Sequence, residues 1–243
     1  MQSASNNLLI TGNSRGLGWG LTRHCLAQGW TVYGCSRQGC QDLQGDLYDI
    51  HCDLKEFESI PSMLTELLQS AQALDLVILN AGVLGQLKEL HDTSLSEIQE
   101  IMDVNVWANK LILDWLHGWD KPIKQIVMIS SGAAVNGNKG WGGYALSKSA
   151  LNMLAKLYAH EFQNTHLSAL APGLVDTDMM EYLCNKVDSA EFPAVQRIQQ
   201  SRGTASTPIP AVAAELIMAA LPTLLNYPSG SFVDIRNLDV GKA

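Results

Sequence analysis

Three side chains have types and spacings that suit proton transfer: Tyr144, Lys148 four residues later, and Ser131 thirteen residues before the tyrosine. A helix that begins near Trp141 would place the phenol and the ammonium on one face. The pKa of tyrosine is about 10, and a neighbouring cation lowers it by favouring the phenolate. A strand ending at Ser131 could aim its hydroxyl at the same point, where it would stabilise negative charge on a carbonyl oxygen. The alternative is an ordinary Tyr–Lys surface pair.

A glycine-containing segment, Thr11–Gly18, directly follows the apolar run Leu8–Ile10. Gly12 could make a tight turn, Gly16 could let the backbone approach a pyrophosphate, and Gly18 could allow a helix to pack closely on a strand. The phosphates would lie at the helix N-terminus, where unpaired N–H groups point outward. The spacing is a variant of the usual dinucleotide-binding pattern, and a purely structural glycine turn is the alternative.

Together these motifs resemble those of the short-chain dehydrogenase/reductase family. The matching segments follow the family's order and extend from residue 8 to about residue 180. They are T-G-x-x-x-G-x-G at Thr11–Gly18, N-A-G at Asn80–Gly82, V-N-V around Asn105, the set Ser131, Tyr144 and Lys148, and P-G-x-V-x-T at Pro172–Thr177. The chain departs from the pattern at Leu79, where many members have Asn, and at Val233–Arg236, which lacks the usual Asp-Gly-Gly.

The resemblance implies an enzyme that reduces a ketone or aldehyde carbonyl to an alcohol. Tyr144 would be the general acid, and Ser131 would polarise the carbonyl. Lys148 would lower the pKa of the tyrosine and hold the nicotinamide ribose, and Asn105 would hold a water that links the lysine to solvent. The positions expected to bind the cofactor are Gly12, Ser14, Arg15, Gly16, Leu17, Gly18, Ser36, Arg37, Asp53, Leu54, Asn80, Ala81, Gly82, Tyr144, Lys148, Pro172, Gly173, Val175 and Thr177.

The end of the second predicted strand favours NADP(H) over NAD(H). An NAD enzyme of this fold needs an acidic residue there for the ribose hydroxyls, whereas NADP needs cations for its 2′-phosphate. This chain has Ser36 and Arg37 there, so Arg37 could bind the 2′-phosphate. Arg15 in the glycine turn could bind the same phosphate. The alternative is that both arginines are solvated surface residues. Asp53 would accept from the adenine amino group unless it caps a helix. Asn80–Gly82 would pack against the adenine ribose unless it is a plain turn.

The connection at about 178–207 is expected to form a lid over the nicotinamide. Its Met179 and Tyr182, with Trp141, would suit an apolar or aromatic carbonyl compound, unless Trp141 only packs at the start of its helix. The string Ser130–Ala134, with Lys-Gly-Trp shortly after it, resembles the sepiapterin reductase and benzil reductase branch, whose typical substrate is a ketone beside a second carbonyl. The alternatives are a catalytically silent protein that binds NADP(H) as a sensor or scaffold, and the same fold acting on 3-oxoacyl or sugar substrates.

An alternation of strands and helices must position these residues. Right-handed crossovers predict an α/β Rossmann-type, doubly wound parallel sheet of about seven strands with helices on both faces, in a single domain over 1–243. The cofactor-binding half would be about 1–125 and the catalytic half about 126–243. At most one helical turn fits within Gln38–Asp46. Compact apolar runs predict strands at Leu8–Thr11, Thr31–Ser36, Leu47–Cys52, Leu74–Asn80, Gln125–Ser130, Leu167–Ala171 and Ser231–Asp234, and helices through Gln28 and at Phe57–Ala71, Ser96–His117, Gly143–Phe162 and Pro210–Leu224.

Composition narrows the choice of partners. A net charge of −8 argues against nucleic acid and anionic membranes, which bind clustered Lys and Arg. No apolar run would span a membrane and the polar start predicts no signal peptide, so a cytoplasmic protein is expected. The five cysteines form no C-x-x-C pair, which argues against disulfides and a metal site. The helices at Ser96–His117 and Gly143–Phe162 are apolar on more than one face, which predicts a homodimer or homotetramer.

Overall fold

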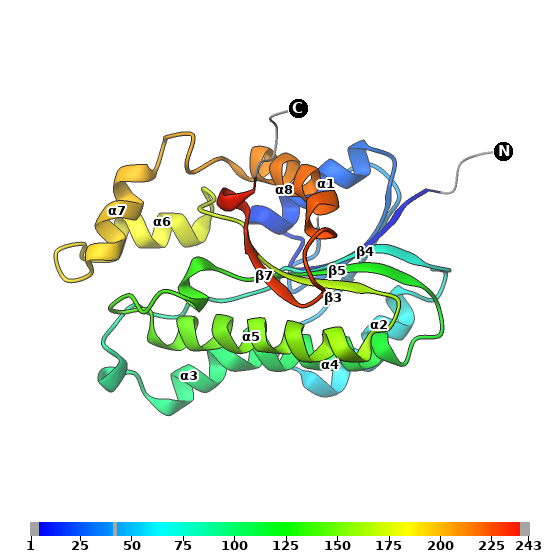
Figure 1. Cartoon of the computed structure of the whole chain (residues 1–243), viewed down its shortest axis with the longest axis horizontal. Coiled ribbons are helices and arrows are strands. Elements are labelled where there is room, and N and C mark those ends of the chain that lie inside the picture. Colours follow the sequence, from blue (N-terminus) through cyan, green and yellow to red (C-terminus); the bar gives the residue numbers. More distant parts are fainter. Residues whose placement is uncertain (1–4, 41–42, 239–243) are drawn as a thin grey trace.

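The computed structural model describes residues 5–40 and 43–238, and a seven-stranded sheet forms its centre (Figure 1). All neighbouring strands pair in parallel, in the order β3-β2-β1-β4-β5-β6-β7. The predicted doubly wound sheet is therefore confirmed, and each strand boundary differs from the prediction by at most two residues. The strands are β1 (Asn7–Thr11), β2 (Thr31–Ser36), β3 (Leu47–His51), β4 (Leu74–Leu79), β5 (Ile123–Ile129), β6 (His166–Ala171) and β7 (Ser231–Asp234).

Helices cover both faces of the sheet and enclose two apolar cores (Figure 1). Helices α1 (Gly16–Ala27) and α8 (Pro210–Leu224) lie on one face, and α2 (Ile60–Leu67), α4 (Ala108–His117) and α5 (Gly142–Glu161) lie on the other. Because side chains alternate along a strand, Leu8 and Ile10 of β1 enter the core under α1 and α8, whereas Leu9 enters the other core. Among residues 5–40 and 43–238, none of the helices combines the length and hydrophobicity that crossing a bilayer requires.

Two long helices predicted from sequence are interrupted in the structure. The prediction at Ser96–His117 corresponds to α3 (Leu95–Met102), a π-helical segment (Asp103–Trp107) and then α4. The prediction at Phe57–Ala71 corresponds to a 3-10 turn followed by α2, which ends at Leu67. Apolar periodicity locates such helices, but it does not detect a single wider turn within one.

The connection between β6 and α8 contains two helices that the sequence analysis did not predict. They are α6 (Asp178–Asn185) and α7 (Pro193–Ser201), with Pro193 in the first turn, where proline needs no N–H partner. Figure 1 shows them at one side of the sheet, apart from the two helical layers. Between β2 and β3, the described residues 38–40 and 43–46 contain no helical turn, and the other two residues of the predicted turn lie outside the described part of the chain.

Candidate active site

A cavity of about 630 Å³ gathers the segments that follow β1, β2, β3, β4, β5 and β6. Ligands of doubly wound sheets bind at these carboxyl ends of the strands. Three predicted residues, Asn105, Lys148 and Tyr182, are not in the cavity wall. The predicted residues that line it are Gly12, Ser14, Arg15, Gly16, Leu17, Gly18, Ser36, Arg37, Asp53, Leu54, Asn80, Ala81, Gly82, Ser131, Trp141, Tyr144, Pro172, Gly173, Val175, Thr177 and Met179.

The turn between β1 and α1 depends on glycine at three positions. Gly12 and Gly16 have φ values of 70° and 54°, which glycine adopts without steric strain. A Cβ at Gly18 would lie 2.1 Å from the Gly12 carbonyl oxygen, so α1 can begin this close to β1 only without a side chain there. Asn80 Nδ2 donates to the carbonyl oxygens of Thr11 and Gly12, at 3.1 Å each. Asn80, predicted to contact a ribose, therefore also stabilises the turn.

Ser131, Tyr144 and Lys148 meet at the other end of the cavity, as their spacing predicted. Ser131 follows β5, and its hydroxyl hydrogen-bonds the phenol of Tyr144 and accepts from the Ala133 N–H at 3.1 Å. Lys148 is one turn after Tyr144 on α5 and lies behind the wall. Its Nζ donates to the Ile129 carbonyl oxygen at 2.7 Å and lies 5.7 Å from the centre of the tyrosine ring. The hydroxyl and the phenol thus line one corner of the cavity, and the ammonium lies behind that corner.

Burial is the main influence on the pKa values of Tyr144 and Lys148. Burial raises the pKa of Tyr144 to about 12, although the hydrogen bond from Ser131 opposes this change. Burial also lowers the pKa of Lys148 to about 8. Both side chains are less than a tenth exposed, and burial disfavours the charged form of each group. The Lys148 ammonium donates to the Ile129 carbonyl, a contact that no local sequence pattern predicts.

Asn105 lies in the π-helical segment and is fully buried. Its Oδ1 accepts from the Val83 N–H at 2.8 Å, and its Nδ2 donates to the Val83 carbonyl oxygen and to Ser147 Oγ, at 2.9 Å each. A Cβ at Gly82 would lie 3.2 Å from Asn105 Oδ1 and 3.4 Å from Lys148 Nζ, so both groups approach the same glycine. Asn105 therefore joins the strand-end segment to α5, through Ser147, which the sequence analysis missed.

The end of the cavity near β2 carries the two arginines. Arg37 is exposed in the wall, and Ser36 is buried with its hydroxyl unpartnered. Arg15 Nη1 forms an ion pair with Asp178 Oδ2 at 3.0 Å, which ties the glycine turn to α6. Asp53 Oδ1 accepts from the Lys55 N–H at 3.0 Å, and the residue that caps the following 3-10 turn is Glu56. The helix-cap alternative for Asp53 is therefore not supported.

An apolar cluster borders the catalytic corner. Trp141 and Tyr144 lie with ring centres 6.1 Å apart, and the Trp141 Nε1 is buried without a hydrogen-bond partner. Tyr182, predicted to contact substrate, instead accepts from the Leu87 N–H at 3.4 Å, outside the wall. Helices α6 and α7 supply much of the cluster, whose buried members are Leu84, Trp141, Tyr144, Leu183, Phe192 and Val195.

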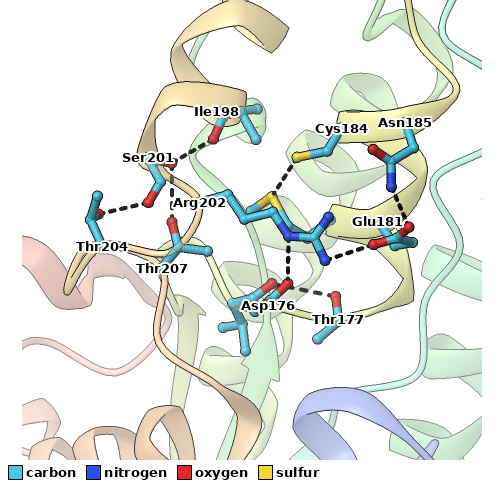
Figure 2. A network of polar contacts seen from close by, with 12 residues as sticks. Asp176, Thr177, Glu181, Cys184, Asn185, Ile198, Ser201, Arg202, Thr204 and Thr207 are labelled. Atoms are coloured by element: carbon cyan, nitrogen blue, oxygen red, sulfur yellow. Dashed lines mark hydrogen bonds and ion pairs between the residues drawn. The ribbon is translucent and has the colours of Figure 1, made fainter.

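A polar network holds α6 and α7 in place (Figure 2). Arg202, just after α7, places Nε 3.1 Å from Asp176 Oδ1 and Nη2 2.7 Å from Glu181 Oε2 on α6. Asp176 lies between Val175 and Thr177, which both line the cavity. Arg202 therefore connects both helices to the wall. Sequence reasoning missed it because its partners are distant in the chain.

Known proteins resemble this chain over most of its length. A family model described as short chain dehydrogenase matches residues 6–188. The benzil reductase ((S)-benzoin forming) of Saccharomyces cerevisiae is 30% identical over 245 residues, covering 90% of this chain and 92% of the yeast protein. The NADPH-dependent pterin aldehyde reductase of Arabidopsis thaliana is 28% identical over 194 residues, covering 72% and 76% of the two chains. A short chain dehydrogenase/reductase from Saccharomyces cerevisiae has the same fold, with a TM-score of 0.81, 20% identity and 98% of both chains covered.

Proposed function

The chain belongs to the short-chain dehydrogenase family, and from this premise we propose that it is an NADPH-dependent reductase of ketones or aldehydes. Members of the family use nicotinamide cofactors and act on small molecules. The observation that carries the proposal is the meeting of Ser131, Tyr144 and Lys148 at one end of a cavity whose other end contains the glycine turn and Arg37. One cavity thus combines a proton donor with a site suited to a phosphate-containing ligand.

The residues of the cavity fit a nicotinamide dinucleotide. The glycine turn has the close backbone approach that a pyrophosphate needs, and the start of α1 offers its free N–H groups. Asp53 and the segment Asn80–Gly82 would contact the adenosine, while Pro172–Thr177, Tyr144 and Lys148 would border the nicotinamide half. When bound, the cofactor supplies a hydride to the carbonyl carbon.

Tyr144 would donate the proton that the carbonyl oxygen gains. A pKa raised to about 12 keeps the phenol protonated at neutral pH, which is the form that reduction requires. Ser131 would hydrogen-bond the same oxygen and stabilise its growing negative charge. Lys148, with a pKa of about 8, remains largely charged at neutral pH and would hold the ribose while favouring proton release from the tyrosine. Asn105 would hold the water that links the lysine to solvent.

The preference for NADP(H) over NAD(H) rests on the end of β2. The position that would need an acidic residue for NAD is Ser36, and Arg37 follows it in the wall. Arg15 could bind the 2′-phosphate from the other side. Its ion pair with Asp178 is largely exposed, at 63% and 76% of the two side chains, and exposed pairs contribute little stability. A phosphate with two charges could therefore replace the carboxylate as the partner of Arg15.

The apolar cluster supports an aromatic carbonyl substrate with a second oxygen. Trp141 and Met179 offer an aromatic and a flexible apolar surface beside Tyr144. The unpartnered Trp141 N–H is a buried donor, and such a group gains from any acceptor that reaches it. A vicinal dicarbonyl compound would place one oxygen at Tyr144 and bring the other near the indole, in agreement with the benzil reductase relative. A pterin-like side chain is the second substrate class.

We extend the proposal to domain organisation and assembly. The cofactor half would span about 1–125 and the catalytic half 126–243, with α6 and α7 as a lid over the nicotinamide. On α5, Leu146, Met153 and Leu157 are about half exposed, and Trp107 is 41% exposed at the start of α4. Exposed apolar side chains on neighbouring helices favour a homodimer through α4 and α5, or a homotetramer that contains this contact. An active monomer of 26.4 kDa in light scattering would contradict the proposed assembly.

The function is tested by initial rates of NADPH oxidation with benzil and other vicinal diketones, pterin aldehydes, quinones, 3-oxoacyl thioesters and sugars. We expect the highest kcat/KM with an aromatic vicinal diketone, and the Tyr144→Phe variant serves as the blank. Higher rates with 3-oxoacyl thioesters or sugars would contradict the proposed substrate class. Tight NADPH binding without turnover of any compound would instead indicate a sensor or scaffold.

A further inference from the structure

Asn13, within the glycine turn, sends its side chain away from the cavity. The residue is fully buried and absent from the wall, although its neighbours Gly12 and Ser14 line it. Its Nδ2 donates to Asp49 Oδ1 at 2.6 Å. Asp49 is on β3, and β2 lies between β3 and β1 in the sheet. The contact therefore connects the turn after β1 to a strand that is not its neighbour.

Gly34 of β2 makes this contact possible. It pairs directly with Asp49 in the parallel register of β2 and β3. A Cβ at Gly34 would lie 2.1 Å from Asn13 Nδ2 and 3.0 Å from Asp49 Oδ1. Glycine within a strand often marks a place where another group approaches the backbone closely. Here the approaching group is the Asn13 amide, which passes over β2 where a side chain is missing.

The second oxygen of the Asp49 carboxylate holds the connection that carries Arg37. Asp49 Oδ2 accepts from the Cys40 N–H at 2.6 Å. At the other end of this connection, the Ser36 carbonyl oxygen accepts from the Cys52 N–H at 2.9 Å. The segment from Ser36 to Cys40 is therefore fixed to β3 at both ends, with Arg37 between them. One carboxylate thus holds both the glycine turn and the arginine connection.

Buried polar atoms without hydrogen-bond partners occur in the same two segments. Four buried side-chain polar atoms lack a hydrogen-bond partner among the described residues, and two of them are Asn13 Oδ1 and Ser36 Oγ. Such atoms are rare in folded proteins and call for an explanation beyond stability. Ser36 also lines the cavity, so one of these atoms belongs to a residue of the wall.

We infer that Asp49 is a positioning residue that sets the preference of this enzyme for NADP(H), an inference that rests on the proposed function. By accepting from Asn13 and from Cys40, Asp49 fixes the distance between the two segments that carry Arg15 and Arg37. Both arginines can meet one 2′-phosphate only if those segments keep their spacing. Loss of Asp49 should therefore weaken NADPH binding more than NADH binding, because NADH has no group for the arginines to bind.

The test is calorimetric titration of wild type and variants with NADPH, NADH, adenosine 2′,5′-bisphosphate and AMP. In Asp49→Ala both hydrogen bonds are lost, and we expect the Kd of NADPH and of the bisphosphate to rise about tenfold, against less than about threefold for NADH and AMP. Turnover at saturating NADPH should stay within about twofold of wild type, because Tyr144 is untouched. In Asp49→Asn the new amide can accept from Cys40 and donate to Asn13 Oδ1, so most of the preference should return.

Two further variants make the test independent of how well Asp49→Ala folds. Asn13→Ala removes the crossing side chain alone and should lower the NADPH preference in the same direction, even if Asp49→Ala folds poorly. Asp75→Ala is the matched control. Asp75 also accepts from a backbone N–H, that of Asn7 at 2.9 Å, but it lies where the strands begin, opposite their carboxyl ends. Its loss should change stability without changing the ratio of the two Kd values.

The outcomes separate this inference from the proposed function. If wild type binds NADPH and NADH equally, the proposed NADP(H) preference is wrong. If wild type prefers NADPH but Asp49→Ala weakens both dinucleotides by the same factor, only the inference about Asp49 is overturned. It is also overturned if Asp49→Asn is as impaired as Asp49→Ala, since the carboxylate would then act through its charge and not through its two hydrogen bonds.

Discussion

The two ends of the cavity hold their charged groups in opposite ways. At the catalytic end, Tyr144 and Lys148 are 8% and 3% exposed, and burial shifts both pKa values. At the other end, the Arg15 side chain is 63% exposed and Arg37 is also exposed. A proton donor depends on a fixed position and a tuned pKa, whereas a phosphate can be held by charges that water also reaches. Substitutions at the first end should change rates, and those at the second should change cofactor choice.

The largest effect is expected from Tyr144→Phe. The variant loses only the ionisable hydroxyl, so kcat should fall by about three orders of magnitude while the Kd of NADPH changes by less than about twofold. Tyr158→Phe is the matched control, because Tyr158 is on the same helix but its hydroxyl bonds Asp114. More than about a tenth of wild-type turnover in Tyr144→Phe would show that Tyr144 is not the acid.

Lys148→Met should lower kcat/KM by about two orders of magnitude, since both ribose binding and tyrosine ionisation lose a cation. In the oxidation direction, the acidic limb of the pH–rate profile should move to higher pH, because the phenolate loses a stabilising charge. Steady-state rates across a pH series measure both effects. Normal activity with an unshifted profile would remove Lys148 from the mechanism.

The same variant should also change how stability depends on pH. Burial lowers the pKa of Lys148 from 10.5 to about 8, so between these values the unfolded chain binds more protons. The stability that this group contributes is fully present above about pH 10.5 and is lost as the pH falls through about 8. We therefore expect Lys148→Met to be more stable than wild type at neutral pH, with a difference that shrinks as the pH rises. Denaturant unfolding at several pH values measures this, and a constant difference would contradict it.

A smaller effect is expected at the exposed end. Wild type should prefer NADPH over NADH by at least about tenfold in kcat/KM, which corresponds to about 1.4 kcal/mol. Arg37→Asp should reverse the preference, because it removes a cation and adds an acidic partner for the ribose. Added salt should reduce the wild-type preference, since the charges involved are exposed. Arg23→Asp, outside the cavity wall, is the control, and an unchanged preference in Arg37→Asp would rule out this phosphate site.

The smallest effect is expected from Trp141→Phe. This change keeps an aromatic ring but removes the unpartnered N–H, so kcat/KM for a vicinal diketone should fall about fivefold while that for a simple aryl ketone changes little. Because only the diketone has a second carbonyl oxygen, the difference between the two changes in kcat/KM measures the contact of that oxygen with the indole N–H. An equal loss for both would mean that Trp141 acts only through packing.

Local sequence patterns were enough to predict the strands of this molecule and the topology of its sheet. Each strand is a compact apolar run, and the motif residues follow strands, so parallel topology brings Gly12, Asp53 and Ser131 to one cavity. Residues such as Asn13, Gly34 and Asp49 escaped prediction because their contact crosses a strand and leaves no local pattern. The family match covers only residues 6–188, so it could not reveal Arg202.

The errors at the catalytic end have a different origin. Spacing alone cannot predict the pKa of Tyr144, because burial raises it and Ser131 opposes that change. Helices α6 and α7 were missed because each is short and turn residues separate them, and their stability comes from packing on the apolar cluster. The spacing of residues in the sequence indicates which side chains can approach one another. Their pKa values also depend on burial, which becomes known only from the folded structure.

The π-helical segment has a consequence for insertions and deletions in this chain. A π turn contains about one residue more than an α turn, and one residue corresponds to about 100° of helical rotation. Deleting one residue from Asp103–Trp107 would therefore turn it into a regular α turn while α3 and α4 keep their relative rotation, so Ile112 and Leu116 would stay against the sheet and the change would fall on Asn105 and its contact with Val83. The same deletion in the exposed turn after α6 would only shorten a surface loop. The extra residue of the π turn thus serves the position of Asn105 and not the rotation of α4 relative to α3.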